Sequence, residues 1–154
     1  MKTRKMLLAV AAVFATVLVC FAADANMGSW KLNEAKSKFA AGATKNHMVS
    51  YTADGDNVKV TVDGVTSDGK KVHSEWTGKF DGKDYPVTGD PTDDSRAYKR
   101  VNASTLSMTL KKDGKVTATG QIVVSSDGKT RTVTIKGTDA MGKTVSSMAV
   151  YDKQ

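Results

Sequence analysis

Apolar and polar residues alternate along most of the chain beyond residue 26. In one stretch, Val58, Val60 and Val62 are separated by Lys59 and Thr61. Successive side chains of a β-strand point to opposite faces, so a period of two is typical of strands with one buried face. The pattern predicts ten strands, at residues 28–32, 47–53, 57–65, 71–80, 84–87, 95–101, 104–111, 115–125, 130–137 and 144–152.

Tight-turn signals separate these segments. Asp-Gly pairs occur at positions 54–55, 68–69, 81–82, 113–114 and 127–128, and a looser turn spans 139–143. Glycine supplies the positive φ angle that hairpin turns need, so each pair predicts two neighbouring antiparallel strands. Two longer interruptions remain. Asn33 is expected to cap a helical turn over residues 34–36, packed by Phe39, and residues 88–94 form a polar loop.

An open meander of antiparallel strands has two exposed edges, and closing the sheet removes both. We therefore predict an all-β protein, an antiparallel up-and-down meander closed into an 8–10-stranded lipocalin-like β-barrel. An immunoglobulin-type sandwich is the alternative, but it would require Greek-key connections and usually has a Cys-Trp-Cys core. A barrel of this size is filled by side chains or holds one small ligand.

The first 25 residues have the three parts of a secretory signal peptide: a basic head, an uncharged apolar run at 6–22 and an Ala-Asp-Ala cleavage site at 23–25. We predict a signal peptide at 1–25, a single domain at 26–154 and a secreted or periplasmic location. We expect no stable membrane insertion after cleavage. A transmembrane anchor is the alternative, although 17 apolar residues are few for a span of about 20. A lipid-modified Cys20 is a third alternative, but Val19 stands directly before it, where a bacterial lipobox has Gly, Ala or Ser.

Composition changes once the signal is removed. Loss of Lys2, Arg4, Lys5 and Asp24 lowers the 23 basic and 16 acidic residues to 20 and 15, a net charge of +5. The basic residues are spread along the chain without an arginine cluster, so we expect no nucleic-acid partner. Val, Ile, Leu and Phe supply only 21 of the 129 remaining residues. This shortage of large apolar side chains favours an interior that is not completely filled.

Both ends of the domain resemble those of a known superfamily. The segments Gly28-Ser29-Trp30-Lys31-Leu32 and Val150-Tyr151-Asp152-Lys153 are similar to the first and last strands of calycins, meaning lipocalins and fatty-acid-binding proteins, here as a small exported bacterial barrel. The resemblance implies a closed barrel with an internal apolar ligand site. Three departures exist. Fatty-acid-binding proteins are usually cytosolic, whereas this chain is expected to be exported, which suits the lipocalin side of the superfamily. Ala149 stands where the carboxylate-binding members have Arg, and the space between the first two strands is too short for their helical lid.

Several candidate site residues follow from strand alternation. Trp30 is expected at the closed end of the barrel, and in lipocalin-like folds this Trp packs under a basic side chain. Arg131 is the candidate partner because it lies on the same strand face as Val133 and Ile135. Such a contact is stabilised by cation–π attraction. Arg131 either meets the acidic head of a ligand or closes the barrel bottom structurally.

A second candidate set lies on one strand, where Arg96, Tyr98 and Arg100 alternate on one face. An inward face would form a polar wall for a carboxylate or phosphate. Because an unpaired buried Arg is costly, an inward pair implies a ligand anion or an internal acid. The alternative is an outward, solvated face.

Apolar candidates complete the predicted ligand site. Trp76 and Phe80, separated by Gly78, either line a cavity or pack in the core, and Met108, like Met48 and Met148, suits an adaptable apolar lining. The full set of predicted ligand-binding residues is Trp30, Trp76, Arg96, Tyr98, Arg100, Met108, Arg131 and Tyr151.

Polar pairs point weakly to other chemistry. His73 and Glu75 share a strand face, which is either the start of a metal site or an exposed polar face; His47 is too distant in sequence to complete it. We predict no metal and no cofactor. We also predict no enzyme activity, because the sequence offers no nucleophile in the context of a catalytic triad. The predicted function is binding of a small apolar or amphiphilic ligand by a monomer. The alternative is a filled, ligandless barrel that acts as a surface-binding or structural envelope protein.

Overall fold

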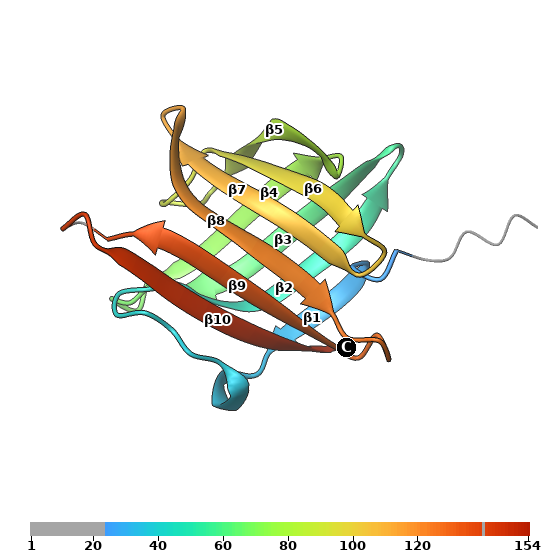
Figure 1. Cartoon of the computed structure of the whole chain (residues 1–154), viewed down its shortest axis with the longest axis horizontal. Helices are drawn as coiled ribbons and strands as arrows, with labels where there is room; N and C mark the ends of the chain where they lie inside the picture. The colour runs from blue at the N-terminus through green and yellow to red at the C-terminus, as the bar shows by residue number, and fades with distance from the viewer. Residues whose placement is uncertain (1–23, 140) are drawn as a thin grey trace, which may run out of the picture.

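The strands close into a barrel, as the alternation predicted. The computed structural model describes residues 24–139 and 141–154. Its strands run in the order of a meander, and β1 lies beside β10 (Figure 1). They are β1 (Gly28–Leu32), β2 (Lys45–Asp54), β3 (Asn57–Val65), β4 (Lys71–Gly78), β5 (Asp81–Thr88), β6 (Ser95–Asn102), β7 (Thr105–Lys112), β8 (Lys115–Val124), β9 (Thr130–Thr138) and β10 (Thr144–Lys153).

Closure depends on the short first strand. β1 is antiparallel to both neighbours, and Trp30 lies opposite Val49 of β2 on one side and Lys153 of β10 on the other. Each strand of the barrel therefore has a partner on both sides, and the sandwich alternative is wrong. The prediction of a closed antiparallel barrel is confirmed.

The Asp-Gly turns behave as expected with one exception. Gly55, Gly69, Gly114 and Gly128 have positive φ angles in the turns that join consecutive strands. Gly82 also has a positive φ, but it lies inside β5, where the register shifts between Asp81 and Asp84. The pair at 81–82 therefore forms a bulge, which explains why β5 begins at Asp81 rather than at residue 84.

The connection between β1 and β2 continues along β10 after β1 ends. The predicted helical turn exists as η1 (Glu34–Lys36), and the Asn33 side chain accepts a hydrogen bond from the Lys36 amide at 3.2 Å. The chain then runs beside β10, where Lys38 pairs with Met148. Phe39 packs against the core. The expected packing of this segment by Phe39 is confirmed.

Met48 does not line the interior. Met48 directly precedes the inward-facing Val49, so alternation turns it outward, and it lies opposite the exposed residues Lys31 and Asp63. Facing side chains in an antiparallel pair share one side of the sheet, which places Met48 on the outer face. The same argument places Met148, opposite Thr134, on the outer face.

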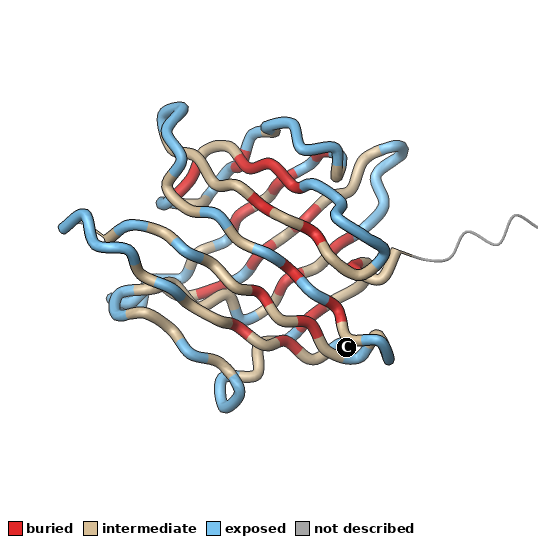
Figure 2. The backbone as a smooth tube through the Cα atoms, in the orientation of Figure 1, coloured by how far each residue is buried: buried red, intermediate tan, exposed pale blue. Residues whose placement is uncertain are grey.

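The two ends of the barrel differ in how well the interior is filled. We call the end with the start of β1 and the close of β10 the terminal end, and the opposite one the far end. In β8, β9 and β10 the buried segments lie toward the terminal end (Figure 2). Toward the far end, the inward-facing residues Leu110 and Ile135 are only partly buried. Solvent therefore reaches part of the inner surface from the far end.

Residues just before β1 pack against the terminal end. Asn26 is fully buried, and its backbone oxygen accepts a hydrogen bond from Trp30 Nε1 at 2.9 Å. Asp24 accepts hydrogen bonds from the Asn26 amide at 3.0 Å and from the Arg100 guanidinium. Asp24 and Ala25, which belong to the predicted signal peptide, thus contact the domain. The cleavage site after Ala25 stays a prediction; residues 1–23 lie outside the described part of the chain.

A chain that begins at Asn26 is expected to melt a few degrees below one that begins at Asp24. Loss of the Asp24 carboxylate removes its contacts with the Asn26 amide and Arg100, at about 1 kcal/mol. Thermal unfolding of the two purified chains, followed by circular dichroism, measures the difference. Asp24→Asn in the longer chain should fall between them. Equal melting temperatures would contradict a structural role for Asp24.

Candidate functional site

Arg131 on β9 lies at the centre of the terminal half of the barrel. It is 2% exposed. Its guanidinium carbon lies 5.2 Å from the ring centroid of Trp30, 4.9 Å from that of Tyr51 and 4.8 Å from that of Tyr151. The predicted contact between Trp30 and Arg131 is therefore present. Aromatic faces attract a cation but supply no hydrogen-bond acceptor in the plane of the guanidinium.

The polar edge of Arg131 is unsatisfied. Nε and Nη1 are buried and have no hydrogen-bond partner among the described residues. An arginine stays charged in proteins, and a buried charge without a partner is strongly unfavourable. The site therefore has one cation more than its own acceptors can balance. An anion that reaches this guanidinium would remove the imbalance.

Arg96 faces the interior in a different environment. Its Nε and Nη2 donate to the two carboxylate oxygens of Asp93 at 2.9 Å each, and Nη2 also lies 3.3 Å from Asp90. The inward orientation is one of the two alternatives that the alternation allowed, and Asp93 is the internal acid that it required. Burial lowers the pKa of Arg96, but Tyr98 and Asp93 raise it by more, so the guanidinium stays charged.

Tyr98 lies beside Arg96 in the interior. Its hydroxyl accepts a hydrogen bond from Arg96 Nη1 at 3.3 Å, and its ring packs edge-on against Trp76 at 4.8 Å. Burial raises the pKa of Tyr98, and the positive charges of Arg96 and Arg131 oppose that rise. The pKa of Tyr151 is raised to about 12, mainly by burial. Both phenols are therefore neutral at physiological pH and retain a proton to donate.

The remaining predicted residues divide between the core and the rim. Trp76 stacks near Phe80 at 6.3 Å, and its Nε1 donates to the Arg96 carbonyl oxygen at 2.9 Å. Met108 is buried and packs onto Gly120, where a Cβ would collide with the Met108 side chain. Both residues fill the core.

Arg100 lies apart from Arg96 and Tyr98 although it shares their strand face. It is exposed at the terminal end, pairs with Asp24 and lies 5.2 Å from the Phe80 ring centroid. β6 ends at Asn102, so the direction that is inward at Arg96 leads out of the barrel at Arg100. The structure therefore does not bring Arg100 together with the interior arginines.

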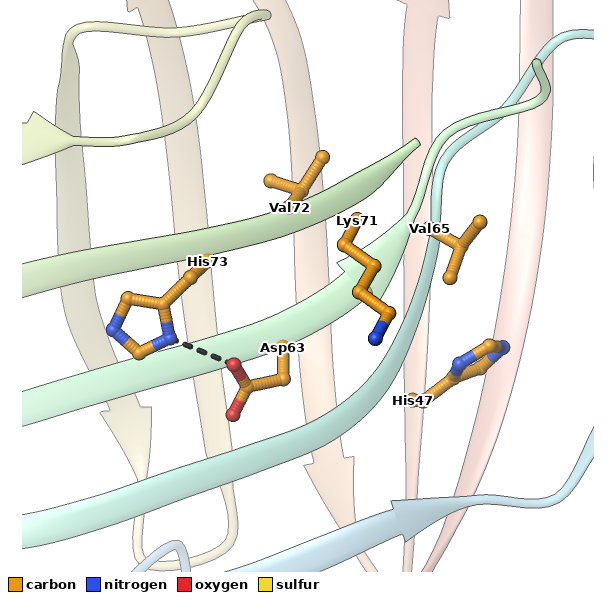
Figure 3. A pocket seen from close by; sticks show the side chains of 7 residues that line it. His47, Asp63, Val65, Lys71, Val72 and His73 are labelled. Carbon is orange, nitrogen blue, oxygen red and sulfur yellow. Dashed lines mark hydrogen bonds and ion pairs between the residues drawn. The ribbon is translucent and has the colours of Figure 1, made fainter. Parts of the chain in front are cut away.

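A separate hollow of about 360 Å³ lies on the outer side of the barrel, near the far end. His47, Asp63, Lys71 and His73 contribute to its lining (Figure 3). His73 Nδ1 is 2.7 Å from Asp63, and this hydrogen bond is the main reason why the pKa of His73 is raised. Sequence distance had separated His47 from His73, but both border this hollow. Among the described residues, no set of three His, Cys, Asp or Glu side chains is arranged to hold a metal.

Two interior residues were not found from the sequence. Tyr51 alternates in phase with Val49, so the strand pattern alone contained a signal for its inward orientation. Asp93 belongs to an irregular loop, and no periodicity indicated that its carboxylate would be buried. Tyr51, Tyr98, Tyr151 and Arg131 together give the interior hydroxyl groups, aromatic surface and a guanidinium without a carboxylate partner among the described residues. Such a set can hold an anionic group by charge-assisted hydrogen bonds.

Comparison with known proteins supports the fold. No known family model matches the chain, and no curated protein matches its sequence. The structure is similar to that of EF1p2_mFAP2b bound to DFHBI, with a TM-score of 0.51 at 13% identity over 86% of this chain and 97% of that one. Lobster apocrustacyanin A1 gives a TM-score of 0.44 at 12% identity over 86% of this chain and 63% of that one. At these identities the likeness to EF1p2_mFAP2b concerns the barrel fold alone.

No helix within the described ranges is long and apolar enough to cross a membrane.

Proposed function

We propose that the barrel binds one small amphiphilic molecule, with an apolar body in the far half and an anionic head directed toward Arg131. The observation that carries this proposal is the buried guanidinium without a carboxylate partner among the described residues. Arg96 is the internal comparison, because the chain supplies it with Asp93. A ligand anion would do for Arg131 what Asp93 does for Arg96.

The far half suits the apolar body of such a molecule. Leu110 and Ile135 face inward and are partly buried, so each has apolar surface left to cover. Ala118 and Gly137, which pair across β8 and β9, contribute small inward-facing residues to the same half. Binding sites for small molecules generally combine apolar walls with a few polar groups that orient the ligand. EF1p2_mFAP2b, a barrel of the same fold, is bound to DFHBI, which illustrates that this architecture can hold a small molecule.

The predicted signal peptide places this activity outside the cytoplasm, and export is part of the proposal. Under it, the protein is a secreted or periplasmic binding protein rather than an enzyme.

The test compares ligands of equal chain length with different heads. Decanoate, decanol and decylammonium are titrated into the protein by calorimetry, with fluorescence of Trp30 and Trp76 as a second readout. A charge-assisted hydrogen bond is worth about 1.5–3 kcal/mol, so decanoate should bind about 10–100 times more tightly than decanol. Decylammonium should bind more weakly than decanol because its charge repels Arg131. Decylammonium binding as tight as decanoate would contradict the anionic head.

Arg131→Met separates a ligand site from a structural plug. This variant should bind decanoate no better than decanol. It should also raise the free energy of unfolding of the ligand-free protein by about 1–2 kcal/mol, since an unpaired buried charge is replaced by an apolar side chain of similar length. Lys136→Met is the matched control: it removes one positive charge from an exposed position of the same strand. A purely structural Arg131 would instead give a less stable variant with unchanged binding.

Failure of all three compounds to bind would favour the filled barrel that acts through its surface. The terminal half already resembles such a filled barrel, since Trp76, Leu106 and Met108 are buried together there, with Phe80 packed against them. The difference between the two functions therefore lies in the far half.

A further inference from the structure

The segment 89–94, between β5 and β6, crosses part of the far end. At its start, Gly89 lies against the His73 carbonyl group of β4, so closely that a Cβ would collide with it. At its close, the Asp94 amide donates to the Lys111 oxygen of β7 at 2.9 Å. The Asp94 carboxylate also accepts the Asp113 amide, in the turn after β7, at 2.8 Å. The segment thus joins β5 to β6 at the rim of the far end, and its two ends continue the pairing of β5 with β4 and of β6 with β7.

One buried ion pair attaches the middle of this segment to the interior. The Asp93 side chain is fully buried, and Arg96 holds both of its carboxylate oxygens. Asp90, which is partly exposed, adds a longer contact to the same guanidinium. Pro91 and Thr92, between the two acids, are exposed. The segment is therefore fixed to the barrel by the pair and left in solvent around it.

The Arg96–Asp93 pair differs from apolar core contacts in the effect of removing one partner. Breaking a buried ion pair by removal of one partner is strongly destabilising, because the other charge is left buried and unpaired. Exposed loops attached by few contacts open more readily than the strands that carry them. Asp93 can leave the interior only if residues 90–93 move. That movement breaks the bonds of Asp93 and Asp90 to a single residue, Arg96.

We propose that the 89–94 segment is a lid over the far end, latched by Arg96 and Asp93, and that its opening sets the rate at which amphiphilic molecules enter and leave the barrel. This inference rests on the proposed function, because it assigns a route to the same interior. It gives the two arginines separate roles. Arg131 holds the ligand head, and Arg96 holds the lid.

The experiment combines hydrogen exchange with binding kinetics in Asp93→Asn. Exchange at residues 87–95, measured by mass spectrometry, should accelerate at least about tenfold in the variant, while β9 amides change much less. Stopped-flow tryptophan fluorescence with decanoate should show faster association and faster dissociation, with the dissociation constant changed less than either rate. Asp127→Asn, in an exposed turn at the terminal end, is the control and should leave both measurements unchanged.

A milder variant keeps the test decisive if Asp93→Asn folds poorly. Asp90→Asn weakens the longer contact to Arg96 and keeps an amide oxygen that can accept from Thr92, so it should change exchange and rates in the same direction to a smaller extent. Unchanged exchange at 87–95 in both variants, or accelerated exchange with unchanged decanoate rates, would overturn the lid. Absence of decanoate binding to the unmodified protein would contradict the proposed function instead, and exchange would then decide whether Asp93 latches the segment.

Discussion

Trp30→Ala is expected to lower the free energy of unfolding by about 4 kcal/mol, which is within the range measured for removal of a buried Trp. Trp30 is fully buried, and its ring lies between Arg131 at 5.2 Å and Lys153 Nζ at 5.1 Å. Its loss creates a cavity, removes the hydrogen bond to the Asn26 oxygen and takes an aromatic face from Arg131. Since domains of this size are stable by roughly 5–15 kcal/mol, the change is a large fraction of the total.

Urea unfolding followed by the fluorescence of Trp76 measures this effect. Trp30→Phe is the companion variant. It retains an aromatic face for Arg131 but loses the donor to Asn26, so it should cost about 1–2 kcal/mol. If Trp30→Ala were less than about 1 kcal/mol below the unmodified protein, the terminal end would not depend on this residue.

The second large effect is a loss of stability at alkaline pH. The ordinary pKa of a tyrosine is 10.0, and burial raises that of Tyr151 to about 12 in the folded protein. Above pH 10 the unfolded chain therefore releases this proton more readily than the folded one. Stability is at its full value below pH 10 and falls as the pH rises toward 12. A rise from about 10 to about 12 in the pKa corresponds to a loss of roughly 3 kcal/mol from Tyr151. Tyr98, whose pKa is also raised by burial, adds to the loss.

Comparison with Tyr151→Phe isolates this contribution from that of the lysines, which titrate in the same range. The variant retains the ring beside Arg131 and lacks the ionisable hydroxyl. Free energies of unfolding in urea, measured between about pH 9 and 11.5, should fall less steeply for the variant. Parallel pH profiles for the two proteins would show that Tyr151 does not resist ionisation in the folded state.

Local patterns predicted the elements and one half of the site. Alternation and Asp-Gly turns act over a few residues, so the ten strands were found within a few positions of their observed ends. The partnership of Trp30 and Arg131 also followed, because strand alternation and the calycin resemblance together placed both residues inside. The sequence could not decide whether Arg96 points inward or outward, because alternation assigns residues to two faces without saying which face is buried.

The irregular and terminal parts of the chain depended on the fold. Asp93 has no periodic neighbours, and its burial follows from the path of the 89–94 segment and the partner that Arg96 provides. Arg96 and Arg100 share a face, yet one is buried and the other exposed because Arg100 lies near the terminal end of β6.

The sequence by itself determined that the chain forms a meander of half-buried antiparallel strands. Side-chain alternation and turn conformation are properties of neighbouring residues, and they are present before any distant segments meet. Only the tertiary structure decided that Arg96 receives an internal carboxylate and Arg131 does not. The balance of charge inside a barrel depends on which strands and loops surround each side chain, and closure of the sheet brings those segments together.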